Sequence, residues 1–465
     1  MKKLSFLLFF AFMLTALRAE IKLPALFSND MVLQQQTTAS IWGKATPNKQ
    51  VTLFTSWNLK RYKTTADKDG NWKFSFTTTK AGGPYTMVIS DGKSVSLNNI
   101  LLGEVWLCSG QSNMEMPMKG FSGQPIEGGN MDILKSENSK VRLFRVTRKA
   151  TLEAQTDVTG RWEEAMPVSV RDFSATAYYF GRLLQETLKV PVGLIASSWG
   201  GSAIEAWMNE EMLTAFPQAK IPQTAENIKT PHQTPTMLYK GMIHPLVGYA
   251  IKGVIWYQGE SNRNRYESYA AMFKSMTDGW RAQWKQEQPI PFYFCQIAPY
   301  GGYNGGANSA LLREAQLNAA KEPHTGMAVL MDTGEENCIH PAKKKEAGER
   351  LALLAITKTY NITGIESESP EYKNIEIKDN QVTVNFDKAS MGLYAQGGES
   401  KLFMLAGEDK VFHPAQAKVQ RNKVVVTSDS VPNPVAVRYA FENFVIGDLF
   451  GMGGLPVSSF RSDNW

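Results

Sequence analysis

Four segments of the chain carry the residue types that serine-based hydrolysis requires. They are residues 110–114 (GQSNM), 199–202 (WGGS), 258–262 (QGESN) and 337–341 (NCIHP). Ser112 offers a hydroxyl and His340 an imidazole. A serine hydroxyl becomes a nucleophile when a base within hydrogen-bond reach takes its proton, and amide donors must then stabilise the oxyanion that develops. The four segments therefore indicate acyl transfer, although no GxSxG nucleophile elbow surrounds Ser112.

Short apolar stretches alternate with amphipathic helical patterns in the middle of the chain. The stretches cover residues 192–197, 251–257, 292–297 and 327–331. Helices are predicted after Ser174, which can cap one, over residues 266–284, and after Pro341. This alternation predicts an α/β domain with a parallel sheet that is covered on both faces. Ligands bind outside the carboxyl ends of such strands, and the four polar segments fall at these ends.

The two flanking regions have the two-residue period of half-buried strands. Residues 21–103 contain short alternating stretches separated by turn signals such as Asp69-Gly70, which predicts a small antiparallel sandwich. The alternation returns at about residue 365 and continues to the end of the chain. The expected organisation is a β-sandwich over residues 20–103, a catalytic domain over 104–360 and a β-rich module over 361–465.

The first nineteen residues have the pattern of an export signal peptide. Lys2 and Lys3 precede an apolar stretch over residues 4–17, and Ala19 offers a cleavage position. The apolar stretch is too short to span a bilayer, and no later stretch is long enough. We therefore expect an exported protein, periplasmic or secreted, without a membrane span.

Composition and charge exclude several other classes of protein. Of 465 residues, 43% are hydrophobic and 20% are charged, which excludes a disordered or collagen-like chain. The net charge of +6, part of which belongs to the expected signal, is too small to indicate nucleic-acid binding. Three cysteines allow at most one disulfide, and the five histidines lie in no metal-binding motif. No metal or organic cofactor is expected.

Longer stretches around the four segments resemble a known family. They are residues 104–118 (EVWLCSGQSNMEMPM), 199–207 (WGGSAIEAW), 256–262 (WYQGESN), 339–341 (IHP) and 455–465 (LPVSSFRSDNW). Together they resemble the sialate O-acetylesterase family, which belongs to the SGNH (GDSL-like) hydrolases and includes related carbohydrate acetylesterases. The resemblance runs over nearly the whole chain after the expected signal. It implies a three-layer SGNH-type domain with a parallel sheet, flanked by β-sandwich-like modules.

The resemblance also implies roles for individual residues. Ser112 is the implied nucleophile and His340 the implied general base. The implied oxyanion hole consists of the Ser112 amide, a backbone N–H of Gly200 or Gly201, and the Gln258 side chain. Glycine lets the backbone approach a tetrahedral carbon closely, and a neutral side-chain amide donates without changing its protonation state. The alternative interpretation of Gln258 is a buried amide that ties two loops together.

The residue that would orient the imidazole departs from the family pattern. Members of the family commonly carry an aspartate two or three residues before the histidine, where this chain has Cys338 and Asn337. Asp332, at the end of the preceding predicted strand, and Glu335 or Glu336 in the loop are the candidate acids. A Ser–His dyad oriented by a backbone carbonyl is the alternative.

Several residues beside the four segments are candidates for contact with the substrate. Arg263 and Arg265 can pair with the carboxylate of a sialic acid, and the alternative is a pair of solvated loop arginines. Trp207 can stack on a sugar ring or brace the floor of the site. Glu260 is expected to accept hydrogen bonds from loop amides rather than to act as an acid.

We expect an esterase that removes O-acetyl groups from sugars through an acetyl-Ser112 intermediate, with sialic acids as the first candidate substrates. Its partner is an O-acetylated sugar or glycan, and its oligomeric state is left open. One alternative is an acetylesterase for xylan or another acetylated polysaccharide. The other is a non-catalytic glycan-binding protein on the same scaffold, which the missing aspartate and the two β-rich regions suggest.

Overall fold

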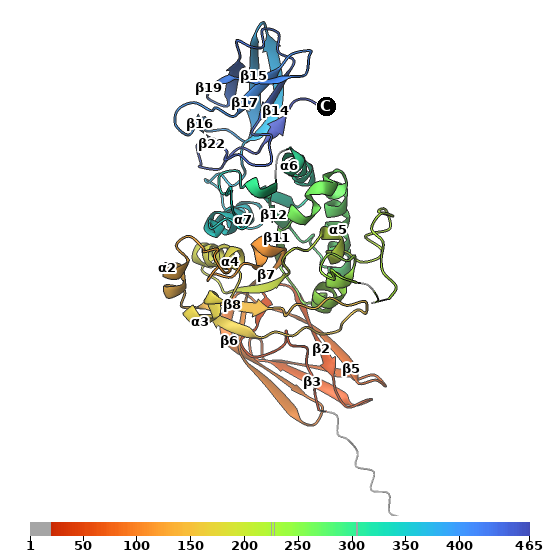
Figure 1. The fold of residues 1–465 in the computed structure, drawn as a ribbon. Coiled ribbons are helices and arrows are strands. Elements are labelled where there is room, and N and C mark those ends of the chain that lie inside the picture. Colours follow the sequence, from red (N-terminus) through yellow and green to blue (C-terminus); the bar gives the residue numbers. More distant parts are fainter. Residues whose placement is uncertain (1–19, 225, 227, 304–305) are drawn as a thin grey trace, which may run out of the picture.

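The computed structural model describes residues 20–224, 226, 228–303 and 306–465. The expected export signal, residues 1–19, lies outside the described residues. The described chain is elongated, with the N-terminal strands at one end and the C-terminal strands at the other (Figure 1). A layered α/β region lies between them and contains all four polar segments.

The middle region is built on a mostly parallel sheet, as the sequence predicts. Its strands in spatial order are β13 (Thr325–Ala328), β12 (Phe292–Cys295), β11 (Gly253–Tyr257), β7 (Ser94–Gly110), β10 (Val192–Ser198), β8 (Asn138–Arg145) and β9 (Trp162–Ala165). All neighbours in this order are parallel except β8 and β9. The fourth apolar stretch, residues 327–331, was expected to be a strand throughout, but β13 ends at Ala328. Ala328 pairs with Cys295, which is the last residue of the neighbouring strand β12.

Seven α-helices and five 3₁₀- or π-helical segments connect the strands of the described chain. The helices are α1 (Ser112–Glu115), α2 (Gly129–Leu134), α3 (Pro167–Arg171), α4 (Ala175–Leu188), α5 (Tyr269–Trp284), α6 (Asn308–Ala319) and α7 (Lys344–Lys358). The turns are η1 (Ile204–Trp207), η2 (Tyr239–Ile243), η3 (His244–Leu246), η4 (Glu260–Ser268) and η5 (Gly301–Tyr303). Ser174 caps α4 as predicted, since its hydroxyl accepts a hydrogen bond of 3.1 Å from the Ala177 N–H.

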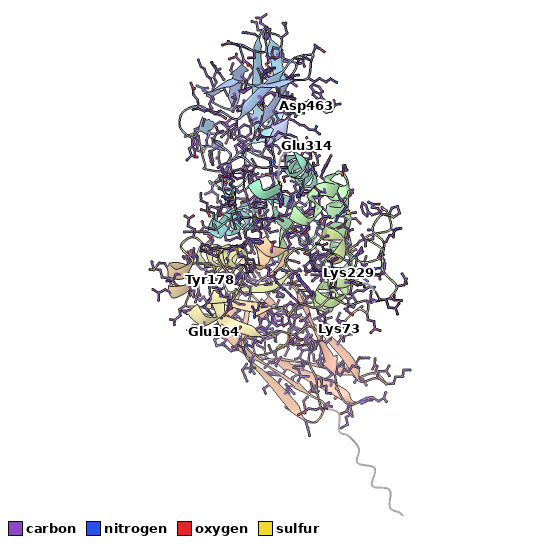
Figure 2. The ribbon with its side chains drawn as sticks, in the orientation of Figure 1. Lys73, Glu164, Tyr178, Lys229, Glu314 and Asp463 are labelled. Atoms are coloured by element: carbon purple, nitrogen blue, oxygen red, sulfur yellow. The ribbon has the colours of Figure 1, made fainter. Side chains whose placement is uncertain are left out.

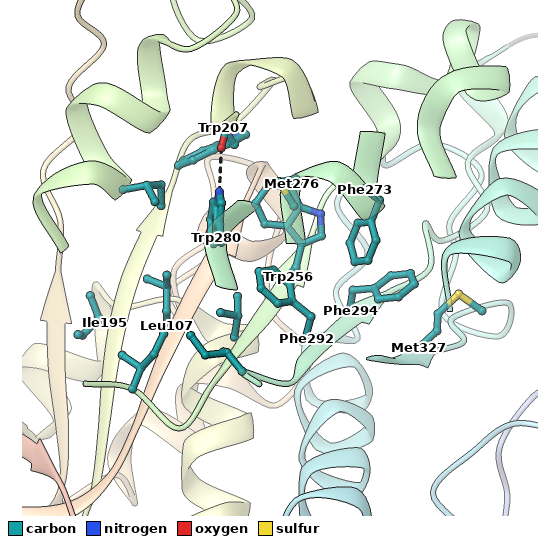
Figure 3. Packing of buried hydrophobic residues seen from close by; sticks show 14 of the residues in the cluster. Leu107, Ile195, Trp207, Trp256, Phe273, Met276, Trp280, Phe292, Phe294 and Met327 are labelled. Carbon is teal, nitrogen blue, oxygen red and sulfur yellow. Dashed lines mark hydrogen bonds between the residues drawn. The ribbon is translucent and has the colours of Figure 1, made fainter. Parts of the chain in front are cut away.

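Alternate residues of β7 face opposite sides of the sheet and divide its core into two layers. Trp106 and Cys108 belong to the apolar cluster that contains side chains of α4 and α7. Val105 and Leu107 belong to the cluster that contains the apolar face of α5, part of which Figure 3 shows. The second half of β7 is buried on both faces and has no solvent-facing side, which explains its apolar residues 105–108. The three-layer α/β arrangement is confirmed.

The strand β7 runs without interruption through two regions of the protein. Its first half pairs with β6 (Gly82–Ser90) and β1 (Val32–Gln34), and its second half pairs with β10 and β11. The boundary expected at residues 103–104 therefore lies inside one strand of 17 residues. The other N-terminal strands are β2 (Thr38–Lys44), β3 (Gln50–Thr55), β4 (Lys60–Thr65) and β5 (Asn71–Thr77).

The C-terminal region consists of antiparallel strands. One sheet contains β14 (Glu371–Lys378), β15 (Gln381–Asp387), β20 (Lys423–Thr427) and β19 (Gln416–Gln420). A second contains β18 (Phe412–Pro414), β17 (Phe403–Ala406), β21 (Ala436–Tyr439) and β23 (Phe460–Arg461), and β16 (Leu393–Ala395) pairs with β22 (Leu449–Gly451). Arg461 joins this region to α6, because its guanidinium lies 2.9 Å from the carboxylate of Glu314 on that helix. Figure 2 labels Glu314 and, in the C-terminal region, Asp463, which lies 3.8 Å from the same guanidinium. Within the described part of the chain, no helix has the length and apolarity needed to span a bilayer.

Candidate active site

Ser112 lies where β7 ends and α1 begins. Gly110 has a φ of +137°, and a Cβ at this position would overlap the backbone carbonyl of Tyr257 in β11. The Gln111 N–H donates a 2.9 Å hydrogen bond to the same carbonyl. The end of β7 is thus pressed against β11, and only glycine fits the turn. Ser112 is the first residue of α1, where backbone N–H groups have no acceptor inside the helix.

The loop with the two glycines lies directly against Ser112. A Cβ built on Gly200 would come within 3.3 Å of the Ser112 Cβ and 3.2 Å of a Glu115 carboxylate oxygen. The Gly200 N–H donates to that carboxylate over 2.8 Å. Gly201 has a φ of +73°, and among the described residues its N–H has no hydrogen-bond acceptor. Of the two glycine amides, that of Gly201 therefore remains free to meet a ligand.

Gln258 is completely buried at the end of β11. Its Nε2 donates to Asn262 Oδ1 over 2.7 Å and to the Ser202 carbonyl over 3.1 Å. Its Oε1 accepts a 3.0 Å hydrogen bond from the Tyr269 hydroxyl. The amide thus ties the loop of the glycines, η4 and α5 together, and both of its N–H groups have acceptors inside the protein.

His340 lies in the loop between β13 and α7 and is half-buried. Its Nδ1 is 2.7 Å from Gln124 Oε1, and the Phe121 ring meets the imidazole edge to face at 5.2 Å. Burial, with a smaller contribution from the Lys344 ammonium, lowers the pKa of His340 to about 4. The imidazole is consequently neutral, and able to accept a proton, at ordinary pH.

Two of the three acids that the sequence offered as partners of His340 bind other groups, and the side chain of the third, Glu336, is exposed. Both carboxylate oxygens of Asp332 bind the Arg350 guanidinium, at 2.7 and 2.6 Å. A carboxylate oxygen of Glu335 accepts a 2.6 Å hydrogen bond from the Ala342 N–H. Among the described residues, no carboxylate forms a hydrogen bond with the His340 ring.

A buried polar cluster joins the Ser112 and His340 loops from below. The Asn113 Nδ2 donates to Glu260 Oε1 over 2.6 Å and to the Ile339 carbonyl over 3.2 Å. Burial raises the pKa of Glu260, while the Asn113 amide and the Lys344 ammonium oppose that shift. Burial lowers the pKa of Lys344 to about 8, and its ammonium donates a hydrogen bond to the Pro341 carbonyl. Glu260 is thus a structural acceptor at the base of the site.

A cleft opens on the side of Glu115, and neither Ser112 nor His340 is among the residues that line it. Its volume is about 540 Å³, and its walls include Glu115, Phe121, Arg148 and Ser198. The Arg148 guanidinium donates to both oxygens of the Glu115 carboxylate over 2.5 Å. Its central carbon lies 5.5 Å from the centre of the Trp199 ring. Further cations on the walls are Lys119 and Arg145.

The residues expected to contact the substrate are in different situations. Arg265 is 3.2–3.3 Å from the buried Glu205 carboxylate. Arg263 has no carboxylate partner among the described residues and lies 4.1 Å above the Tyr303 ring. Trp207 is fully buried, and its indole packs at right angles to Trp256 in the core.

Trp207 also takes part in two hydrogen bonds. Its indole N–H donates to Ser202 Oγ over 2.9 Å, and its carbonyl accepts from the Trp280 indole over 3.1 Å (Figure 3). Neither face of this ring is open to a sugar. Trp199 is half-exposed and stacks on His232 with 5.9 Å between the ring centres, so it is the tryptophan that a ligand can reach.

Two residues of the site, Glu115 and Gln124, were not predicted from the sequence. Glu115 lies within the motif around Ser112, and its position three residues after the nucleophile, on one face of α1, was an available signal. Gln124 comes from an irregular loop, and nothing in its neighbourhood in the sequence marks it as a partner of His340.

Comparisons with known proteins identify relatives of this chain. Residues 102–357 match the family model described as carbohydrate esterase, sialic acid-specific acetylesterase. The human protein named sialate O-acetylesterase is 30% identical over 418 residues, which cover 82% of this chain and 78% of that protein. The sialate O-acetylesterase of Pongo abelii is 29% identical and covers 89% of this chain and 86% of its own.

A solved structure extends the likeness to the whole molecule. The crystal structure of a carbohydrate acetylesterase from Xanthomonas citri superposes with a TM-score of 0.88 at 34% sequence identity, covering 96% of this chain and all of that one. A family model that spans more than half of the chain, together with these relatives, identifies the protein as an ester hydrolase. The chain belongs to the sialic acid-specific acetylesterase family of carbohydrate esterases.

Proposed function

We propose that this protein removes O-acetyl groups from sialic acids by transferring the acetyl group to Ser112. The observation that carries the proposal is the hydrogen bond between Asn113 and the Ile339 carbonyl. These residues adjoin Ser112 and His340 in the sequence, and the bond between them supports a common location for the two segments at one edge of the sheet. The names of the human and Pongo abelii relatives support sialic acid as the sugar.

The reaction proceeds in two balanced steps. The Ser112 Oγ attacks the acetyl carbonyl carbon while the His340 Nε2 takes its proton. The tetrahedral intermediate then breaks the bond between the acetyl carbon and the sugar oxygen, and that oxygen takes the proton from His340 and leaves as a hydroxyl. In the second step His340 takes a proton from water as the water oxygen attacks acetyl-Ser112, the bond between the acetyl carbon and Oγ breaks, and the proton returns to Oγ; acetic acid leaves and ionises to acetate in solution.

The oxyanion is met by backbone amides in this proposal. The N–H groups of Ser112 and Gly201 are the donors, since the Gly200 N–H is bound to Glu115. Gln258 would reach the oxyanion only by giving up its hydrogen bond to the Ser202 carbonyl. Its support of the loop that carries Gly201 is its main contribution to the site.

Two sets of cations can receive a sugar carboxylate. Arg263 is the better candidate of the two arginines that the sequence singled out, because Arg265 already neutralises Glu205. The cleft next to Glu115 offers Arg145 in addition, whose guanidinium donates to the Asp172 carbonyl. We propose that the acetylated sugar occupies this cleft, with Trp199 at its rim.

A second candidate substrate class is an acetylated polysaccharide such as xylan. The Xanthomonas citri structure is compatible with it, since that protein is named a carbohydrate acetylesterase, without a stated sugar, and matches this chain at 34% identity over 96% of its length. Acetate release from O-acetyl sialic acid and from acetyl-xylooligosaccharides, measured side by side, distinguishes the two. A kcat/KM at least tenfold higher on the sialic acid supports the first proposal, and the reverse ratio supports the second.

We further propose that the protein is exported to the periplasm or secreted. The basic Lys2-Lys3 pair, the apolar residues 4–17 and Ala19 support this location. Amino-terminal sequencing of the protein from its native host tests it, with Glu20 as the expected first residue. Recovery of the full-length chain from the cytoplasm would contradict export.

A further inference from the structure

The loop between α1 and α2 forms a closed turn against His340. Phe121 and Gln124 exchange two backbone hydrogen bonds of 3.0 Å each. Gly120, with a φ of +77°, lets the backbone pass so close to the Gln124 carbonyl that a Cβ would overlap it. The Glu127 N–H donates a 3.0 Å hydrogen bond to the Ala342 carbonyl, which docks this loop beside the His340 segment. The turn therefore presents the Phe121 ring and the Gln124 amide together to the imidazole.

The contact between Gln124 and His340 replaces the acid that the sequence lacks. An oxygen that accepts a hydrogen bond at Nδ1 keeps the ring proton there and leaves the Nε2 lone pair to take a proton from Ser112. Asp332 and Glu335 cannot serve, since they bind Arg350 and the Ala342 N–H. Resting on the proposed function, we infer that Gln124 is a positioning residue that fixes the tautomer and the orientation of the His340 base.

A neutral partner has an electrostatic consequence. A carboxylate at Nδ1 would stabilise the imidazolium, and an amide stabilises it much less. Lys344 on α7 is the charged group that acts on the ring, and Cys338, whose thiol donates to the His340 carbonyl, is the nearest titratable group on its own loop. Glu260 reaches the loop only through Asn113, and Glu335 only through Ala342. His340 is therefore set to remain neutral well into the acid range.

Two substitutions at Gln124 separate a positioning role from a merely structural one. Gln124→Ala removes the acceptor, and we expect kcat on an aryl acetate to fall about 10- to 100-fold with KM unchanged within about twofold. Gln124→Glu keeps an acceptor but adds a negative charge. We expect it to retain activity at pH 8 within about threefold and to move the acid limb of kcat/KM upward by about 1–3 pH units, because the charge raises the pKa of the base.

Glu127→Ala is the matched control, since it truncates an exposed side chain of the same loop. Its kcat and acid limb should equal those of the wild type. Wild-type kcat in Gln124→Ala, or an unmoved acid limb in folded Gln124→Glu, would overturn the inference. A kcat that falls equally in the Ala, Glu and control variants would also overturn it, because disruption of the loop would then be the cause.

A spectroscopic measurement tests the same inference without activity. ¹⁵N-histidine NMR of the full chain reports the tautomer of each ring, and comparison with His340→Gln assigns the His340 signals. We expect an Nδ1–H tautomer in the wild type and a mixture of tautomers in Gln124→Ala. An Nε2–H tautomer in the wild type would contradict the role of Gln124. An inactive wild type with the expected tautomer would instead refute the esterase proposal alone.

Discussion

Asn113 and Ile339 are joined by a 3.2 Å hydrogen bond from a buried side-chain amide to a backbone carbonyl. Asn113 follows Ser112, and Ile339 precedes His340, so one contact connects segments that are 226 residues apart. The same amide group also donates to Glu260 over 2.6 Å. A single side chain therefore sets the spacing between the first and last motifs and the carboxylate beneath them.

Replacement of Asn113 should affect both stability and catalysis. Asn113→Ala leaves the buried Glu260 carboxylate without this donor, which should lower the free energy of unfolding by about 1–3 kcal/mol in urea titrations. It also frees the His340 loop, and a small misplacement of a catalytic group should lower kcat about 10- to 100-fold. Asn130→Ala, at an exposed position of α2, is the control. A destabilised variant with wild-type kcat would show that this bond does not align the two loops.

Glu115 should contribute more to catalysis than its partner Arg148 does. Glu115→Ala removes the acceptor of the Gly200 N–H as well as the ion pair, whereas Arg148→Ala removes the ion pair and the contact with Trp199 but leaves that acceptor in place. We expect kcat on an aryl acetate to fall at least fivefold further in Glu115→Ala than in Arg148→Ala, because only the first change frees the Gly200–Gly201 turn. Steady-state kinetics at a fixed pH measures the difference. An equal loss of kcat in the two variants would show that Glu115 acts through its ion pair with Arg148 and not through the Gly200 N–H.

The acid limb of activity should depend on Lys344. The base works only when His340 is neutral, so kcat/KM should fall as the pH drops through the pKa of His340, which is about 4. Lys344→Gln removes a positive charge that lowers this pKa, and the limb should therefore move to higher pH. The shift should be smaller than one pH unit, because burial is the larger cause. Circular dichroism at each pH checks that the loss of activity at low pH does not come from unfolding. A shift of the acid limb to lower pH in Lys344→Gln would contradict the electrostatic effect of Lys344 on His340.

Arg263 and Arg265, which both lie in η4, should have different roles when each is replaced by alanine. Arg263→Ala should raise KM for O-acetyl sialic acid about tenfold or more, since an arginine–carboxylate hydrogen bond contributes about 1.5–3 kcal/mol, and leave KM for a neutral aryl acetate unchanged. Arg265→Ala should instead lower thermal stability, because Glu205 is buried and loses its counter-ion. Equal effects of Arg263→Ala on KM for both substrates would contradict a contact between Arg263 and the substrate carboxylate. Arg145→Ala would then be the next variant to measure.

The sequence predicted those parts of the fold that depend on local signals. The cap at Ser174 and the apolar period of α4 determine that helix regardless of what it packs against. The apolar stretches of β10 and β11 likewise predict buried parallel strands, and the polar segments after them predict the edge where the site lies. The expected boundary at residues 103–104 follows the change from short alternating stretches to an α/β pattern in the sequence, whereas β7 continues through that position as one strand.

The remaining features depend on contacts that are distant in the sequence. Asp332 has the position and chemistry of an orienting acid, but Arg350 on α7 binds it. Trp207 resembles a sugar platform in its motif, yet the packing of Trp256 and Trp280 covers it. Gln124 is an ordinary loop glutamine until folding brings it to His340. Side-chain pairing across loops has no local signal, and only the folded structure reveals it.

The most direct test of the nucleophile is the rate of acetyl-ester hydrolysis by Ser112→Ala. Wild-type protein and the variant, both verified as folded, are compared on O-acetyl sialic acid and on p-nitrophenyl acetate. We predict that kcat falls about 10³-fold or more on both substrates. We also expect mass spectrometry of the quenched wild-type reaction to detect an acetylated Ser112 peptide, and the variant to lack it. Hydrolysis at the wild-type rate by Ser112→Ala would contradict the assignment of Ser112 as the nucleophile.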